Sequence, residues 1–288
     1  MTKSPLSTTL RQQLAKTFDH PNYHPPPLSS VALELQSFTT RDDVDVDQVV
    51  RLLERDQMLA GAVMRLVGSP LYAGRGPARS LRDAVLRLGI RTVRDAVFEA
   101  ALKKSAVGAP EHNELMTRIA RHGTATAYLT RVVCRRARIQ DEQAFLCGLL
   151  HDVGFFALLF AIAQKKVQDL PPLPELWPEV DALHEQASRV VTKAWGLPGD
   201  LSVVVGNHHH EHTGASSRVA AVVNVADFLS ARFAANVLGP PGADGVPLPA
   251  CPITEVSVVD SLSVIGLDDS ALDPIVADAT PILESALA

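Results

Sequence analysis

The sequence predicts an all-α fold, and three observations lead to this class. Signals that start and stop helices recur along the chain, and two-residue alternation, the mark of a strand, is scarce. The best strand candidate, Thr254–Val259, is short. Elsewhere apolar residues recur with the period of one buried helix face, as in the run Leu59, Ala62, Val63, Leu66 and Val67.

The helix signals can be assigned to particular segments. Asp45 is placed to cap a helix that carries the apolar residues Val49, Val50, Leu52 and Leu53. Ser80 with Asp83 resembles a capping box ahead of a further helix, and Gly89 is placed to end that helix. Beyond Val259 we expect amphipathic helix that packs through Leu272, Ile275, Val276, Ile282 and Leu283.

Proline- and glycine-rich segments divide the chain into helical groups. The breaks fall at Pro21–Pro27, Gly108–Pro110, Pro171–Pro178 and Gly239–Pro252. They predict an N-terminal extension (1–24), an N-terminal lobe (28–105), a second lobe (112–236) and C-terminal helices (253–288).

Composition and charge exclude several classes of protein. The 288 residues are 47% hydrophobic and 20% charged, which is typical of a globular protein with a sizeable core. A net charge of −5 provides no global positive field for nucleic acid or anionic lipid. With three tyrosines and two tryptophans for base stacking, nucleic-acid binding is not expected. We interpret one basic run, Arg131, Arg135, Arg136 and Arg138, as solvated surface, and a phosphate-binding patch is the less favoured alternative.

Cysteine usage and hydropathy favour the cytoplasm. Cys134, Cys147 and Cys251 are odd in number and form no CxxC pair, so neither a disulfide framework nor a thiolate zinc site is indicated. The first ten residues lack the apolar core of a signal peptide. The most apolar run, Phe155–Ala163, is shorter than the roughly 20 residues that span a bilayer. We therefore expect a cytoplasmic protein with no membrane partner.

Histidines and aspartates on apolar faces are the most informative feature. His122 shares one helix face with Leu115, Ile119, Thr126, Leu129 and Val133. Asp227 falls on the face of Ala220 and Val223, and His184 lies at the edge of another apolar stripe. His151 and Asp152 directly follow the apolar run Phe145–Leu150.

These residues have a structural interpretation and a functional one. A single histidine on an apolar face is more often a hydrogen-bonded core residue than a ligand, and Asp227 could bond a neighbouring backbone group. Several ionisable groups buried together are costly unless they satisfy one another or bind a cation. The set therefore predicts a metal site with nitrogen and oxygen ligands. Within Asn207–His212, adjacent histidines on a helix diverge by about 100°, so at most two of the three consecutive histidines should face one pocket.

Sequence motifs add a family resemblance over roughly residues 25–280. Gly148–Gly154 closely matches the "GLLHDIG" motif of the HDOD family, the HD-related output domains of bacterial signalling proteins. His184, Trp195–Pro198 and His208–His209 follow the spacing of that family. In the N-terminal part, Pro26–Ala32, Leu53–Leu59, Leu66–Pro70 and Leu81–Gly89 resemble the family's opening segments, with Gln57 in place of a proline and Gly68 in place of an asparagine. The resemblance implies one HDOD-type helical domain, in which an N-terminal helical lobe packs on an HD-like core.

The same layout resembles the HD-GYP phosphodiesterases, whose metal ligands follow the order H…HD…H…HH…D. On this sequence the resemblance implies one or two divalent transition-metal ions, with iron or manganese favoured over zinc. If the chain is an enzyme, Asp152 bridges the ions. The implied ligands are His122, His151, Asp152, His184, His208, His209 and Asp227.

Two departures weigh against hydrolysis of cyclic dinucleotides. Phe155 stands where HD-GYP enzymes carry a lysine, and Glu211–Ser216 replaces the GYP segment. The resemblance therefore favours a regulatory output module whose partners are signalling proteins on separate chains. The alternative is a metal-dependent phosphohydrolase acting on a phosphate-containing small molecule, with Arg121 or Arg218 contacting the phosphate.

Overall fold

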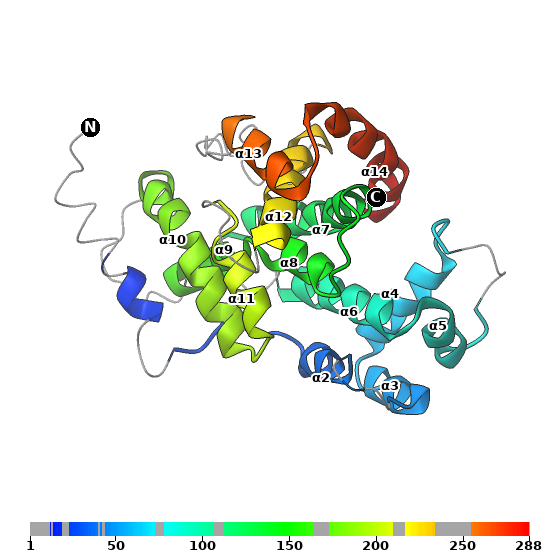
Figure 1. The fold of residues 1–288 in the computed structure, drawn as a ribbon. Coiled ribbons are helices and arrows are strands. Elements are labelled where there is room, and N and C mark those ends of the chain that lie inside the picture. The colour runs from blue at the N-terminus through cyan, green and yellow to red at the C-terminus, as the bar shows by residue number, and fades with distance from the viewer. Residues whose placement is uncertain are drawn as a thin grey trace, which may run out of the picture.

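The computed structural model describes residues 12, 14–18, 23–39, 41, 44–72, 78–105, 112–163, 173–209, 217–233 and 255–287. All regular elements in these ranges are helices, which confirms the all-α prediction (Figure 1). The expected segments Glu211–Ser216 and Gly239–Pro252, together with Cys251, lie outside the described residues.

Five helices of the N-terminal part pack against one another. They are α2 (Ser30–Phe38), α3 (Val46–Leu53), α4 (Gln57–Gly68), α5 (Leu81–Leu88) and α6 (Ile90–Ser105). The predicted caps are present: Asp45 accepts a hydrogen bond from the Asp47 amide, and Ser80 accepts one from the Asp83 amide. Gly89 ends α5 with a φ of 75°, a conformation that glycine adopts without steric cost. Leu59, Val63 and Val67 form the buried stripe of α4.

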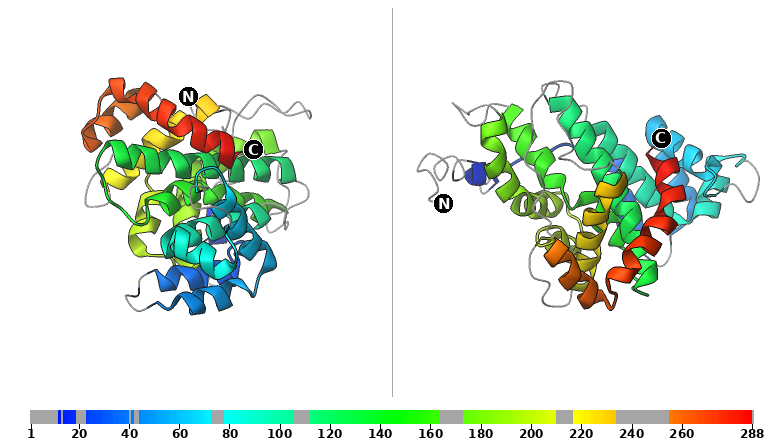
Figure 2. Two further views of the ribbon diagram at one scale, coloured as in Figure 1. Left: turned by 90° about the vertical axis from the view of Figure 1, so that its right-hand side faces the viewer. Right: turned by 90° about the horizontal axis from the view of Figure 1, so that it is seen from above.

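The long helix α7 (Asn113–Arg136) is the centre of the second part. It packs against α8 (Ala144–Leu150), α12 (Ser217–Ser230) and α14 (Leu272–Ala286), as Figure 2 shows from two sides. Next to it, α9 (Val153–Ala163) packs on α10 (Leu173–Ala194), and α11 (Gly199–Val205) lies against α10 and α8. The predicted face of α7 is buried at Ile119, His122, Thr126, Leu129 and Val133.

A buried ion network joins α6 to α7 and α8. Asp95 pairs with Arg94, whose side chain is 1% exposed, and with Arg131 of α7. Arg94 also donates a hydrogen bond of 2.7 Å to the backbone oxygen of Glu142, just before α8. Arg131 lies over the ring of Phe145 at 4.2 Å, so this member of the basic run is structural rather than solvated. The helical period could not reveal this partner, because Asp95 is 36 residues away in sequence.

The strand candidate Thr254–Val259 is wrong. Within its described part the chain forms α13 (Glu255–Ile265), which packs on α12. Val258, Leu262 and Ile265 are buried at i, i+4 and i+7, so the helical period overrides a short alternation. The predicted C-terminal helix is present as α14, with Ile275, Ala279 and Leu283 buried.

The described part of the break expected across Pro171–Pro178 is helical. Helix α10 begins at Leu173 and includes Pro178. The amide that Pro178 lacks would bond to the residue four positions earlier, so the cost is confined to the first turns of the helix. The rest of α10 continues to Ala194 and carries His184.

The most apolar stretch of the chain is core. Ala144–Ala163 is long and apolar enough to cross a membrane, but 89% of its window is buried inside the protein. The stretch is also divided into α8 and α9 by a turn at His151 and Asp152. That turn places two polar side chains in the centre of the fold.

Candidate metal centre

All seven predicted ligands lie together in the second part of the fold. They come from α7 (His122), the turn between α8 and α9 (His151 and Asp152), α10 (His184), the turn after α11 (His208 and His209) and α12 (Asp227). They form two groups, and within each group the ligand atoms lie within 4.8 Å of one another. One group consists of Asp152, His184, His208 and His209, and the other consists of His122, His151 and Asp227. Except for His209, these residues are at most 6% exposed.

The Asp152 carboxylate lies between the two groups. Its Oδ2 is 3.3 Å from Nε2 of both His122 and His151. Its Oδ1 is 3.5 Å from Nε2 of His184 and 3.4 Å from Nε2 of His208. Each carboxylate oxygen therefore faces one group, which is the arrangement that a carboxylate shared by two cations requires. The same Nε2 atom of His122 lies 3.1 Å from Asp227 Oδ1.

The imidazole tautomers are set by the outer ring nitrogens. His151 Nδ1 donates to the Gly148 carbonyl at 2.8 Å, and His208 Nδ1 donates to the Val205 carbonyl at 2.8 Å. His184 Nδ1 donates to the Asp181 carbonyl in the same way. A proton on Nδ1 leaves the Nε2 lone pair facing the cluster, which is the form that binds a metal.

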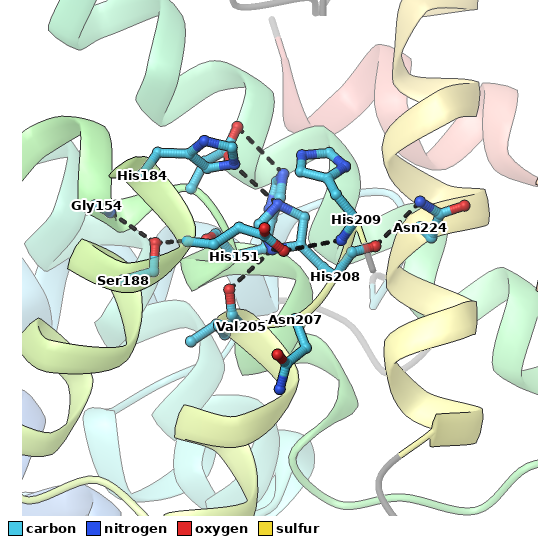
Figure 3. A network of polar contacts seen from close by, with 12 residues as sticks. His151, Gly154, His184, Ser188, Val205, Asn207, His208, His209 and Asn224 are labelled. Carbon is cyan, nitrogen blue, oxygen red and sulfur yellow. Dashed lines mark hydrogen bonds and ion pairs between the residues drawn. The ribbon is translucent and has the colours of Figure 1, made fainter. Parts of the chain in front are cut away.

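A close contact between α9 and α10 lies beside His151 and His184 (Figure 3). The Ser188 hydroxyl accepts from the Gly154 amide at 2.8 Å and donates to the His151 carbonyl at 2.7 Å. A Cβ on Gly154 would lie 1.9 Å from the His184 carbonyl oxygen, so only glycine permits this approach of α9 to α10.

A second set of contacts holds the His208–His209 turn. Asn224 donates to the His208 carbonyl at 3.0 Å, and Ser261 of α13 donates to Asn224. Glu185 accepts from the His209 amide at 2.9 Å (Figure 3). The side chains of His208 and His209 both face the cluster. His210 lies outside the described residues, so the expectation for the third histidine stays a prediction.

Phe155 fixes the plane of His184. Its ring is stacked on the imidazole, with centroids 4.6 Å apart and an interplanar angle of 7°. Its other face is stacked on Trp177 at 5.2 Å and 8°. The residue that replaces the expected lysine is thus an apolar wall of the cluster rather than a cation.

The electrostatics of the cluster are those of a cation site. Burial opposes charge on His122, but Asp227 and Asp152 raise the pKa of His122 to about 10. Burial also opposes charge on Asp227, yet His122 holds the pKa of Asp227 at about 2. Burial and the neighbouring His208 lower the pKa of His209 to about 3. Two buried carboxylates thus stay ionised and draw positive charge into the cluster.

The hydrogen bonding of the buried polar atoms distinguishes a closed polar core from a site that fits a metal ion. Four buried side-chain atoms of the cluster have no hydrogen-bond partner: Asp152 Oδ1, His184 Nε2, His208 Nε2 and Asp227 Oδ2. Buried polar groups are normally satisfied, because leaving one unpaired costs about 1–3 kcal/mol. Asp152 Oδ1 lies 3.4–3.5 Å from Nε2 of His184 and His208 without an aligned hydrogen bond to either, so these residues fit a divalent cation better than a self-satisfied network.

Three residues that support the ligands have no signal in the sequence. Ser188, Glu185 and Asn224 are polar residues on helices with no motif to single them out. The two phosphate candidates, Arg121 and Arg218, are both exposed. Arg121 lines a surface hollow with Asn113 and Arg118 at the start of α7.

Comparison with solved structures shows the same fold. An HDOD domain protein of unknown function from Geobacter sulfurreducens is 21% identical, with a TM-score of 0.67 and coverage of 97% of both chains. A proposed metal-dependent phosphohydrolase from Shewanella amazonensis SB2B is 19% identical, with a TM-score of 0.64 over 90% of this chain and 97% of that one. A proposed signal transduction protein from Marinobacter aquaeolei VT8 is 20% identical, with a TM-score of 0.63 over 98% of this chain and 65% of that one.

A helical fold that buries histidines and aspartates in the HD order defines a class of HD-related domains. Within that class the chain belongs to the HDOD family, whose model matches residues 26–211. No curated protein matches the sequence.

Proposed function

We propose that this chain is a regulatory domain of bacterial signal transduction that binds two divalent transition-metal ions in its HD-like lobe and acts through protein partners. The observation that carries the proposal is the Asp152 carboxylate, whose two oxygens face two separate groups of ligands. His184, His208 and His209 would hold one ion with Asp152. His122, His151 and Asp227 would hold the other. Imidazole and carboxylate donors suit iron and manganese, and also zinc.

The closure of the cluster favours regulation over turnover. Six of the seven ligand residues are at most 6% exposed, and Phe155 stacks on a ligand where a phosphate-binding cation is expected. A structural metal site is closed by protein ligands, whereas a catalytic site keeps an open position. The likeness to a proposed signal transduction protein agrees with this role.

We divide the domain into an N-terminal lobe (28–105), a second lobe (112–236) and C-terminal helices (253–288).

A second candidate function is metal-dependent phosphate ester hydrolysis. It is favoured by the shared carboxylate, because two-metal hydrolases hold their ions about 3.5–4 Å apart. Such ions supply an activated water and neutralise charge on phosphate oxygens. His209 is the least buried ligand, so substrate would enter on its side of the cluster.

Metal content tests the proposal. Untagged protein is digested and its metals are measured by mass spectrometry for the wild type, His151→Ala/Asp152→Ala and His24→Ala. The exposed His24 lies outside the cluster and is the matched control. We expect two equivalents of transition metal in the wild type and control and none in the double variant. Folded, metal-free wild type that also fails to take up iron, manganese or zinc contradicts the proposal.

Hydrolysis assays then separate the two functions. Metal-loaded protein is incubated with phosphomonoesters and with linear and cyclic phosphodiesters. The regulatory proposal predicts no turnover above the His151→Ala/Asp152→Ala background. Metal-dependent turnover that this variant abolishes establishes the hydrolase instead.

A further inference from the structure

A groove lies apart from the metal centre, where α4, α6, α7 and α14 meet on the right-hand side of Figure 1. Its volume is about 890 Å³. Helices of both lobes therefore contribute to one concave surface. Its apolar lining includes Ala62, Leu66, Ala96, Ala100, Tyr128 and Ile282.

Large apolar side chains are exposed at the edge of this groove. Met58 at the start of α4 is 61% exposed, and Leu71 just after α4 is 47% exposed. Exposed apolar surface around a concavity marks interaction sites in soluble proteins. Methionine is frequent on such surfaces, because its flexible side chain adapts to a partner.

The rim of the groove is basic, although the chain as a whole carries a net charge of −5. Arg65, Lys103 and Lys104 line it, and the one lining carboxylate is Glu99. Glu99 pairs with Lys103 at 2.8 Å and accepts a hydrogen bond from the Tyr128 hydroxyl at 3.3 Å, and three cations against this one carboxylate leave the described lining with an excess of positive charge. The side chains of Lys103 and Lys104 are about half exposed, and ion pairs at such exposure contribute little, so both ammonium groups remain available to a partner.

We propose that this groove binds an acidic amphipathic helix of a signalling protein. An apolar lining with a basic rim complements a helix that carries an apolar stripe between glutamates or aspartates. A helix satisfies its own backbone hydrogen bonds, whereas an extended peptide would bury unpaired amides against Ala96 and Ala100. The proposal rests on the proposed function, in which the domain acts through separate protein chains.

The groove is also connected to the metal-binding lobe. Tyr128, at its inner wall, lies on α7, the helix that carries His122. A helix bound here contacts α4 and α6 of the N-terminal lobe, α7 of the second lobe and α14 of the C-terminal helices. Binding of a helix in the groove would therefore affect how the two lobes pack against each other.

Designed peptides test the surface without knowledge of the natural partner. The probe is a labelled helix of about 16 residues with leucines at i, i+3, i+4 and i+7 flanked by glutamates. One control peptide replaces every glutamate by lysine, and the other keeps the composition but shuffles the leucines. Binding to the full chain is measured by fluorescence anisotropy, and the contact surface by hydrogen exchange. We expect the acidic peptide to bind at least about tenfold more tightly than either control and to protect α4, α6 and α14.

Variants of the groove decide the outcome. Lys103→Glu/Lys104→Glu should weaken the acidic peptide about tenfold, and Ala100→Arg should block it, whereas Lys193→Glu on exposed α10 surface should change nothing. Circular dichroism verifies that each variant is folded. Equal binding of all three peptides, or no binding, overturns the proposal. So does a dimer that Ala100→Arg separates, which would make a second copy the occupant. Metal content is measured independently, so a negative result for peptide binding does not contradict the proposed metal centre.

Discussion

Replacing Gly154 by alanine tests the contact that brings α9 and α10 together. The added Cβ would lie 1.9 Å from the His184 carbonyl oxygen and 2.7 Å from the Ser188 amide nitrogen. Ordinary contact distances begin near 3.4 Å, so the backbone of α10 must retreat by about 1.5 Å. Both neighbours are backbone atoms that cannot rotate away.

The expected cost follows from this geometry. Overpacking a core costs typically 1–3 kcal/mol, and contact with rigid backbone places Gly154→Ala at about 3 kcal/mol or more. For a chain of this size each kcal/mol lowers the melting temperature by about 2–4 °C, so we expect a fall of about 6–12 °C. His184 moves with α10, so its distance to Asp152, 3.5 Å between Nε2 and Oδ1, should increase and metal affinity should fall.

The assay is thermal unfolding followed by circular dichroism, with metal content measured on the same samples. Gly68→Ala is the matched control, because nothing lies within 4 Å of its added Cβ. That substitution should leave stability unchanged or raise it by up to about 1 kcal/mol. A Gly154→Ala protein that melts with the wild type and keeps its metal refutes the reasoning.

Three further predictions concern the cluster and one helix cap. Phe155→Leu, which removes the stack on His184, should lower the affinity of one ion and change the absorption of cobalt-loaded protein, whereas Phe156→Leu should lower stability alone. Asp227 and Asp152 raise the pKa of His122 to about 10 in the metal-free protein, so a metal ion must displace the proton of His122 in order to bind. Metal affinity measured by calorimetry should therefore rise about tenfold per pH unit between pH 6 and 9. A metal affinity that does not change with pH contradicts this prediction. Ser80→Ala should destabilise the protein by about 1 kcal/mol in urea unfolding, because the Asp83 amide loses its acceptor, and an unchanged midpoint excludes the cap.

The fold was predictable where one period or one cap decided the local structure. Asp45 and Ser80 cap helices as expected, and the face of α7 is buried as its period predicts. The prediction failed at Thr254–Val259, because two alternating valines fit a short strand and a helix equally well. Packing on α12 selected the helix.

The gathering of the ligands was indicated by their placement on apolar faces and by the family resemblance. His122 and Asp227 lie 105 residues apart, and only the packing of α12 on α7 brings them to 3.1 Å. The split of the Asp152 oxygens between two groups has no sequence signal, since it depends on the turn between α8 and α9. Supporting residues such as Ser188 and Asn224 were missed for the same reason.

Electron paramagnetic resonance of manganese-loaded protein distinguishes one carboxylate shared by two ions from two independent sites. Two Mn²⁺ ions bridged by Asp152 should give an exchange-coupled spectrum at two equivalents per chain. Asp152→Asn should abolish the coupling, while His24→Ala leaves it intact. An isolated six-line Mn²⁺ signal in the wild type, or no bound manganese at all, would contradict a two-ion centre.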